Sequence, residues 1–357
     1  MAAVSSETIV DGLKKGKIEK LSEEIQYLRF RDGFRGIERG TVIAGRRVIW
    51  GFPHIKRIFT LEMGLKKNMK SKFVTVEEKI DGFNVRIAAI EDKVYAFSRG
   101  GFLDAFVTEK AREMRLEKNF RENPDYVLCG EMIGNTPYTT PTKDFDVKLF
   151  VFDIDYGDGS YLPCEQKYSL IKKYGIDGVP ILGKVRVDDY KALHSIAIAI
   201  NKGRKEGMVL KSMDRKNTVK YVTPWADVDD IANASEKFFD MPIGFYYQRV
   251  LRSAFFIKDF ALDKEEYSRR LGDAFYNGLS NALKKVDQGR EIDEEFEIAI
   301  KDLRIWDDIK KHMSREVKLE ELWRKNENGK TRIRFRKIYK KTTKTLTAYV
   351  GGKGITD

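Results

Sequence analysis

The sequence predicts an α+β protein built around an antiparallel-sheet domain, with a module before it and a helical and a small basic domain after it. Three observations predict this organisation. Short apolar runs separated by turn residues fill residues 63–228, an aromatic-rich helical pattern covers residues 229–290, and basic residues dominate parts of residues 291–357. Short strands with turn signals are typical of antiparallel sheets, and a change to helical periodicity indicates a separate domain.

Composition limits the classes of protein that this chain can represent. Its 357 residues, 42% of them hydrophobic, suffice for about two to four domains with packed cores. The net charge of +12 favours a polyanionic partner such as nucleic acid, although a merely basic protein has the same composition. The two cysteines exclude a disulfide framework and a four-cysteine zinc site, and three dispersed histidines disfavour a histidine metal site.

The sequence shows no membrane segment. No run of roughly 18 apolar residues occurs, and the N-terminus lacks the apolar core of a signal peptide, so we expect a cytoplasmic protein. The charged fraction of 34% is of the kind found in thermophilic proteins.

Residues 1–62 form the predicted N-terminal module, which we expect to lie against the central domain. Two helices are expected within residues 1–30, because Ser5 and Ser22 precede acidic residues as N-caps do. Residues 41–50 are expected to form a hairpin around Gly45.

The central domain alternates predicted strands with a few helices. One helix should follow Asp104, a suitable N-cap, and another should end at Gly175, a favourable C-cap. A third should span residues 188–201. The expected strands are residues 73–76, 85–90, 93–98, 126–129, 148–154, 207–211 and 218–222.

Two later segments each allow two interpretations. The aromatic helical segment is expected to form either an internal core or a surface for self-association. Residues 291–325 are expected to be helical, and the strand after them carries Arg332, Arg334 and Arg336 on one face. Such a row of arginines either contacts a nucleic-acid backbone or is a solvated edge strand.

Lys79 stands at the bend after the first central strand and is followed by Asp81 and Gly82. This is the pattern of a nucleophilic lysine that takes a nucleoside monophosphate from a triphosphate, whereas an exposed hairpin lysine is the plainer interpretation. With a reference pKa of about 10.4, a lysine amine needs burial, cationic neighbours or a metal to react at neutral pH. Further lysines, an acidic metal ligand and an aromatic surface should therefore accompany it.

Residues of these types follow later in the chain. Glu206 and Lys211 stand at the start and end of one predicted strand, and Lys220 lies on its expected neighbour. Glu131 follows a buried strand, where it is placed to accept ribose hydroxyls, and Arg99 at a hairpin end suits a phosphate.

Another predicted strand carries aromatic residues for a nucleotide base. Phe150 and Phe152 share one face of it, and Asp153 lies on the other. Each of these features alone has a common structural explanation, such as a turn or a packed core. Their order along the chain is what indicates nucleotidyl transfer.

In the order of its motifs, the chain resembles the covalent nucleotidyltransferase superfamily. This superfamily comprises ATP-dependent DNA ligases, RNA ligases and mRNA capping enzymes. Asn84 stands five residues past the lysine, where DNA ligases and capping enzymes usually carry arginine, and asparagine there is similar to RNA ligases. The helical segment after Lys220 also differs from the oligonucleotide-binding barrel of DNA ligases. The whole layout resembles the homodimeric, RNA-circularising archaeal ATP-dependent RNA ligases. The motifs are Lys79-x-Asp81-Gly82, Arg99-Gly100, Gly130-Glu131, Phe150-x-Phe152-Asp153, Glu206-Gly207 to Lys211, and Lys220.

The resemblance implies a nucleotidyltransferase domain in residues 63–228, a helical dimerisation domain and an ATP-dependent enzyme that joins 5′-phosphate and 3′-OH ends of single-stranded RNA. Mg²⁺ or Mn²⁺ is the implied metal, and single-stranded DNA 5′ ends are a further implied substrate. A DNA-nick ligase or capping enzyme using the same lysine, and a non-catalytic RNA-binding protein, are the alternatives. The implied roles are nucleophile for Lys79; α-phosphate neutralisation for Lys211 and Lys220; metal binding for Glu206 and Asp153; ATP contact for Glu77, Glu78, Ile80, Arg99, Glu131, Phe150 and Phe152; and RNA contact for Asn84, Arg86, Arg332, Arg334 and Arg336.

Overall fold

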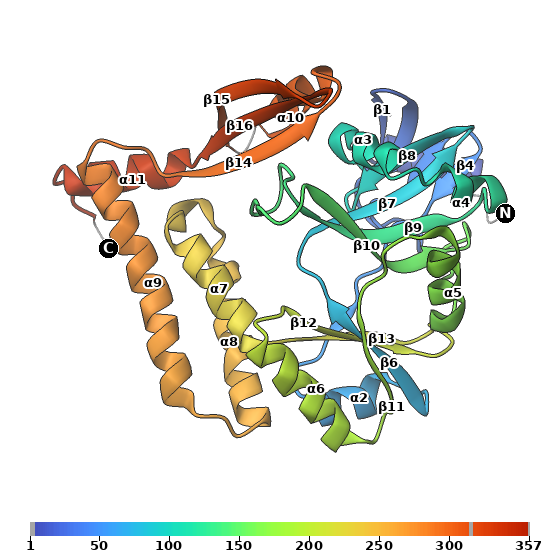
Figure 1. Ribbon diagram of the computed structural model, residues 1–357, viewed down its shortest axis with the longest axis horizontal. Helices are drawn as coiled ribbons and strands as arrows, with labels where there is room; N and C mark the ends of the chain where they lie inside the picture. The colour runs from blue at the N-terminus through green and yellow to red at the C-terminus, as the bar shows by residue number, and fades with distance from the viewer. Residues whose placement is uncertain (1–3, 314–316, 356–357) are drawn as a thin grey trace.

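A computed structural model describes residues 4–313 and 317–355 of the chain (Figure 1). It confirms the predicted fold class, with antiparallel sheets followed by helices and a small C-terminal sheet. Within the described residues, no helix combines the length and the apolar character needed to cross a membrane.

The N-terminal module begins with one helix, which Ser5 caps by accepting a hydrogen bond from the backbone of Thr8. The second predicted helix is wrong, because Ser22 pairs with Gln26 across a hairpin. The predicted hairpin around Gly45 is confirmed. The elements are α1 (Ser6–Lys14), β1 (Ile18–Ser22), β2 (Gln26–Phe30), β3 (Val42–Ala44) and β4 (Arg47–Ile49), with the strands in one sheet of that order.

Two sheets make up the central domain. The five-stranded sheet has the order β11-β6-β12-β13-β5 and is antiparallel except for the parallel pair of β13 and β5. The second sheet, called here the β7–β10 sheet, has the order β10-β9-β7-β8. Their strands are β5 (Lys56–Arg57), β6 (Phe73–Lys79), β7 (Phe83–Ile90), β8 (Lys93–Ser98), β9 (Val127–Gly134), β10 (Val147–Asp155), β11 (Ile181–Arg186), β12 (Gly207–Ser212) and β13 (Thr218–Val222).

The bend after β6 joins these two sheets. The sequence suggested a simple turn between neighbouring strands, but β6 and β7 belong to different sheets and are not paired. Gly82 lies in the crossing, where a Cβ atom would stand 2.7 Å from the carbonyl oxygen of Met132. Only glycine therefore allows the chain to pass this close to β9.

Helices cover the sheets and form their cores. α2 and α6 pack on one face of the five-stranded sheet, where Leu61 and Leu193 join Val74 and Leu210 in one cluster. α3 and α5 contribute Phe106 and Ile171 to the core of the β7–β10 sheet. The helices are α2 (Leu61–Asn68), α3 (Ala105–Glu113), α4 (Glu117–Glu122), α5 (Cys164–Tyr174) and α6 (Tyr190–Lys202), and Gly175 ends α5 as predicted.

The aromatic segment is helical, as predicted, and α9 forms the outer edge of the molecule in Figure 1. The buried residues of this segment, among them Ile231, Tyr246 and Ala274, form an internal core. A set of apolar side chains on α8 and α9 nevertheless faces solvent. Both interpretations of the segment thus keep some basis. The elements are α7 (Pro224–Ser235), a short 3₁₀ helix (Phe238–Asp240), α8 (Ile243–Asp259) and α9 (Lys264–Asp287).

The C-terminal part forms a three-stranded sheet of order β14-β16-β15. The expectation of helices over residues 291–325 is therefore wrong for most of that range. In β14, Phe296 and Ile298 alternate with glutamates and point into the core, so pairing with β16 decides its conformation. The elements are β14 (Asp293–Ile300), α10 (Arg304–Met313), β15 (Lys318–Glu327), β16 (Lys330–Ile338) and α11 (Lys340–Val350).

This C-terminal sheet is docked on α3 of the central domain. The ammonium of Lys110 donates to the carbonyl of Ala299 at 2.6 Å, and Glu109 accepts from the backbone N–H groups of Lys301 and Asp302. Phe296 and Trp306 belong to the same hydrophobic cluster as Phe106. The central and C-terminal domains therefore share one core.

Candidate active site

Lys79 ends β6 and faces away from the helices that cover the five-stranded sheet. Because Val74 and Val76 of β6 point toward α2 and α6, alternation places Lys79 on the opposite face. Its Nζ lies 2.5 Å from Oε2 of Glu206, and burial raises the pKa of that carboxyl. Gly207 lies opposite Lys79 on β12, and a Cβ there would stand 2.2 Å from the carbonyl oxygen of Tyr221. The Glu-Gly pair thus brings the carboxylate to the lysine.

A row of polar and aromatic side chains crosses the neighbouring β7–β10 sheet. Glu131 of β9 is in register with Asn84 of β7 and with Phe150 of β10, so these three side chains share a face. Asn84 donates to Oε1 of Glu131 at 3.2 Å. Within the described residues, Oε2 of Glu131 and Oδ1 of Asn84 are enclosed without a hydrogen-bond partner. These two oxygens are the kind of acceptor that a bound hydroxyl or amine would satisfy.

Burial raises the pKa of Glu131 to about 8. Between the usual value of 4.5 and that value, the unfolded chain carries the charge while the folded chain keeps the proton. Folding stability should therefore be complete below pH 4.5 and fall as the pH rises toward 8, by at most about 1.4 kcal/mol per pH unit.

We expect the substitution Glu131→Gln to remove this pH dependence, because glutamine is neutral throughout. In urea unfolding, the difference in free energy of unfolding between the variant and the wild type should grow steadily in favour of the variant from pH 5 to pH 8. Above pH 8 this difference should stay constant. Unfolding curves that stay a constant distance apart at all pH values would refute a protonated Glu131.

Two further cations lie on the site side of the five-stranded sheet. Lys220 is in register with Val209 of β12, which confirms that its strand neighbours that of Lys211. Burial, and then the positive charges of Arg57, Lys79 and Arg99, lower the pKa of Lys220 to about 8. Arg99 is exposed, and its guanidinium contacts Nδ1 of His54 at 3.1 Å.

Lys211 does not reach this open side, although the sequence suggested a contact with the α-phosphate. It is 1% exposed, and its ammonium lies 2.7 Å from Glu77 and 3.0 Å from Asp153. Burial alone would lower the pKa of Lys211, but these carboxylates raise it. Lys167 of α5 binds Glu77 at 2.6 Å, and Arg215 pairs with Asp153. We call these five residues the buried charge cluster. Lys211 lies on the same sheet face as Lys79 and Lys220, but it is enclosed within this cluster.

The buried charge cluster also corrects two other predictions. Asp153 is enclosed by cations that hold the pKa of its carboxyl well below its usual value despite its burial, which makes it a poor candidate for a metal ligand. A bulge in β10, where Val151 pairs with Gly130 but Asp153 pairs with Cys129, interrupts the alternation assumed from the sequence. Glu77 likewise has one lysine ammonium at each of its two oxygens, which makes it a poor candidate for contact with an adenine amino group.

Three more candidates lie apart from the place expected. Arg86 is fully buried and donates to the carbonyls of Trp50, Gly40 and Ser98, so it joins the N-terminal module to β7 and cannot contact RNA. Glu78 points to the other face of β6 and pairs with Lys205. The Phe152 ring packs edge-on against Phe52 at 5.1 Å, whereas Phe150 remains beside Glu131; Ile80 is half-buried in the crossing.

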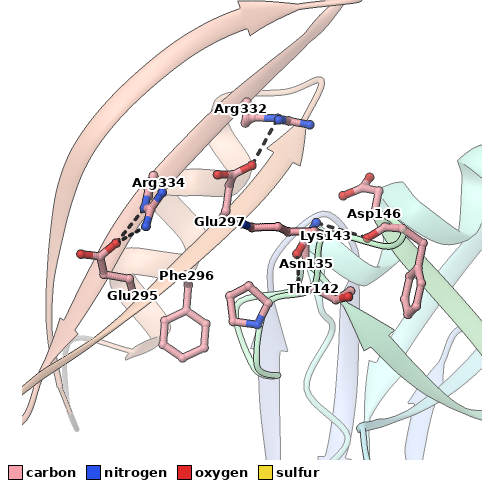
Figure 2. Close-up of a pocket in the computed structure, with 11 residues that line it drawn as sticks. Asn135, Thr142, Lys143, Asp146, Glu295, Phe296, Glu297, Arg332 and Arg334 are labelled. Carbon is pink, nitrogen blue, oxygen red and sulfur yellow. Dashed lines mark hydrogen bonds and ion pairs between the residues drawn. The ribbon is translucent and has the colours of Figure 1, made fainter.

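The arginine row is neutralised within the C-terminal sheet. β16 is the central strand of that sheet, so the edge-strand interpretation is wrong. Arg334 binds Glu295, Arg332 lies 3.3 Å from Glu297, and Arg336 contacts Asp293, Glu291 and Glu320. Figure 2 shows the first two pairs beside Lys143 in a cavity of about 610 Å³. Because carboxylates balance these charges, the row does not by itself call for nucleic acid.

Sequence reasoning missed the residues that the helical domain brings near the site. The pKa of the Asp81 carboxyl is raised by burial and then by the charge of Asp230 on α7, whose own partner is Arg249 of α8. No short-range signal links these positions, since they lie more than a hundred residues apart. Within the described residues, no group of three His, Cys, Asp or Glu side chains is arranged to hold a metal ion.

Comparison with known proteins assigns the chain. Residues 72–222 match the RNA ligase family, and residues 233–353 match the family described as the C-terminal region of ligase Pab1020. An uncharacterized protein of Methanocaldococcus jannaschii is 32% identical over 92% of this chain and 89% of its own.

Solved structures agree over nearly the whole length. An archaeal ATP-dependent RNA ligase has a TM-score of 0.90 at 29% identity, covering 99% of this chain and 97% of that one. A protein provisionally named an ATP-dependent DNA ligase from Aquifex aeolicus has a TM-score of 0.91 at 32% identity, covering 99% and 100%. The chain therefore belongs to the RNA ligase family, and its fold agrees with that of an archaeal ATP-dependent RNA ligase over nearly its whole length.

Proposed function

We propose that this enzyme joins the 5′-phosphate and 3′-OH ends of single-stranded RNA through a covalent lysyl-AMP on Lys79. The observation that carries the proposal is the placement of Lys79, whose amine faces Glu206 at 2.5 Å with Lys220 on the same sheet face. Among the motif lysines, Lys79 and Lys220 are the two whose charge is directed toward the open side of the sheet.

In the first step, Nζ of Lys79 forms a bond to the α-phosphorus of ATP, and the bond to the bridging oxygen of pyrophosphate breaks. The proton lost by Nζ passes toward Oε2 of Glu206, whose raised pKa makes it a better acceptor. The positive charge of Lys220 stabilises the negative charge that develops on the phosphate. An oxygen of the RNA 5′-phosphate then attacks the α-phosphorus, and the bond between this phosphorus and Nζ breaks. Finally the 3′-OH attacks the activated 5′-phosphate, which forms the phosphodiester bond and releases AMP.

ATP and a divalent cation, Mg²⁺ or Mn²⁺, are the proposed cofactors. Glu206 would help to hold such a cation, and Asp81 lies near enough for its charge to raise the pKa of Glu206. This donor set fits a Mg²⁺ ion held mainly by nucleotide phosphates and water, as Mg²⁺ usually is. When bound, such an ion supplies positive charge against the triphosphate.

The row on the β7–β10 sheet is proposed to bind the adenosine and the RNA end. Glu131 and Asn84 offer their unpartnered oxygens as acceptors to ribose hydroxyls, and the amide N–H groups of Asn84 and the exposed guanidinium of Arg99 are the donors for the 5′-phosphate end. Phe150 is the better candidate for stacking on adenine, because the ring of Phe152 already packs against the ring of Phe52. A substrate with both ends on one strand would be circularised.

Incubation with α-labelled ATP or GTP and Mg²⁺ tests the proposal. Acid-resistant label from ATP is expected, and 5′-phosphorylated single-stranded RNA should become circular. The second candidate is a DNA-nick ligase, which the name of the Aquifex aeolicus relative favours. Joining of nicked duplex DNA with no RNA circles would establish that candidate instead.

We also propose that the enzyme is a homodimer through the helical domain, residues 229–290. Ile243 is 88% exposed and Tyr247 is 68% exposed, and with Val250 they form one stripe along α8. Tyr276 and Leu283 are exposed on α9. Exposed apolar side chains gathered at helical spacing are typical of interfaces.

The double substitution Ile243→Asp and Tyr247→Glu should convert the dimer to a monomer in sedimentation. Met63→Glu, at an equally exposed apolar residue of α2, should leave the mass unchanged. Self-labelling with ATP should persist in both variants. A monomeric wild type, or a double variant that remains dimeric, would exclude this interface.

A further inference from the structure

Arg57 is a half-buried guanidinium that forms no ion pair within the described part of the chain. Its Nε is enclosed and has no hydrogen-bond partner among the described residues. A buried cation is costly unless something pairs with it. A residue of this kind is a candidate for binding an anionic ligand.

The sheet register places Arg57 on the face of the active site. β5 pairs in parallel with β13, so Arg57 lies directly beside Lys220, and the backbone N–H of Ile58 donates to the carbonyl of Lys220 at 3.0 Å. Lys220 in turn lies beside Val209, which lies beside Glu77. This is one continuous row across the sheet, with Arg57 at its far end.

The neighbouring residue of the same strand faces the other way. Lys56 is exposed and its ammonium lies 3.5 Å from the side-chain oxygen of Asn68 on α2, behind the sheet. The orientation of Arg57 toward the site is thus fixed by strand alternation rather than by chance contact.

The obvious carboxylate partner for Arg57 is already taken. Asp227 of α7 is bound by both Nε and a terminal nitrogen of Arg252, and Asp230 is bound by Arg249. Burial, and then the charge of Arg252, lower the pKa of the Arg57 guanidinium, whereas the charges of Asp227 and Glu206 raise it without either carboxylate forming an ion pair with Arg57. A structural ion pair between the N-terminal module and the helical domain therefore does not explain Arg57.

Three cations meet at this end of the sheet: Arg57, Lys220 and Arg99. None of them forms an ion pair with a carboxylate in the described part of the chain, and Arg57 and Arg99 both lower the pKa of Lys220. Since β12 and β13 separate β6 from β5, Arg57 lies farther from Lys79 than Lys220 does. The arrangement suits an anion with several charges that extends away from the nucleophile.

We propose that Arg57 binds the β- and γ-phosphates of ATP, which leave as pyrophosphate, with Lys220 serving the α-phosphate. This inference rests on the proposed lysyl-AMP chemistry. Arg57 then contributes to the formation of lysyl-AMP, in which the bond between the α-phosphorus and the pyrophosphate oxygen breaks. It contributes nothing to the two later steps, because no pyrophosphate is present in them.

The test compares Arg57→Met with Lys56→Met, the control in the same strand. The rate of self-adenylation by ATP should fall about 10²- to 10³-fold in Arg57→Met, as when one preorganised donor is removed from a developing charge. Arg57→Lys should recover part of the rate. All variants should seal RNA that carries a preformed 5′-adenylate at the wild-type rate.

Titration with inorganic pyrophosphate provides a readout that does not depend on the chemistry. The wild type and Lys56→Met should bind it, and Arg57→Met should bind it much more weakly while keeping an equal or higher melting temperature. Equal adenylation, or equal loss of sealing and adenylation, would overturn the proposal. If the wild type takes no label at all, the lysyl-AMP function fails, and the pyrophosphate titration still decides whether Arg57 holds this anion.

Discussion

Lys79→Ala should abolish acid-resistant labelling by ATP and leave the sealing of pre-adenylated RNA largely intact. Only the first step uses the amine as a nucleophile, so its removal leaves no group to accept AMP. The variant should therefore form no RNA circles from ATP and 5′-phosphorylated RNA, yet form them from 5′-adenylated RNA without ATP. The two assays on one preparation separate loss of the nucleophile from loss of the fold.

Lys79→Arg provides the matched control for charge. An arginine retains a positive group opposite Glu206 but is not nucleophilic, so it should be as inactive in self-labelling as alanine. Lys205→Ala removes an exposed lysine that pairs with Glu78 on the other face of the same strand, and it should label normally. Label that persists in Lys79→Ala would place the covalent chemistry on another residue.

The largest effect on stability is expected from the buried charge cluster. In Asp153→Ala, Lys211 and Arg215 lose a carboxylate that both contact and remain buried with an excess of positive charge. Breaking a buried pair by removing one partner costs about 3–5 kcal/mol. Chemical denaturation should show a loss of this size.

The control for that experiment is Asp188→Ala, which breaks an exposed pair with Arg186 of 2.7 Å. Exposed pairs contribute little because water and salt screen them, so this variant should unfold at the same denaturant concentration as the wild type. The double variant Asp153→Ala with Arg215→Met should recover part of the lost stability, since it removes one of the two cations that Asp153→Ala leaves without this carboxylate. A single variant as stable as the wild type would mean that water enters the buried charge cluster.

The sequence was sufficient for those parts of the site that local motifs determine. The Lys79 bend and the Glu206-Gly207 pair depend on strand alternation and on glycines without room for a side chain. Their types and spacing are visible in one dimension. The same holds for the helices ending at Gly175 and starting after Asp104.

The sequence did not reveal the carboxylates that neutralise several of the predicted site residues. Lys211 and Arg334 were expected to face phosphates, but Glu77 and Glu295 pair with them from neighbouring strands that are far apart in the sequence. The strand β14 was missed for a related reason, because its glutamates and alanine favour a helix locally and only pairing with β16 selects the extended form. Long-range pairing is what a single sequence does not display.

The shared core around α3 makes the family boundary at residue 222 unsuitable as a cut point. A fragment of residues 72–222 would carry every motif of nucleotidyl transfer, but it would expose the surface that Phe296 and Trp306 cover and leave Lys110 without its acceptor on Ala299. The segment that matches the RNA ligase family is therefore smaller than the unit that shares one hydrophobic core. The C-terminal sheet behaves as a structural part of the catalytic domain that happens to be encoded last.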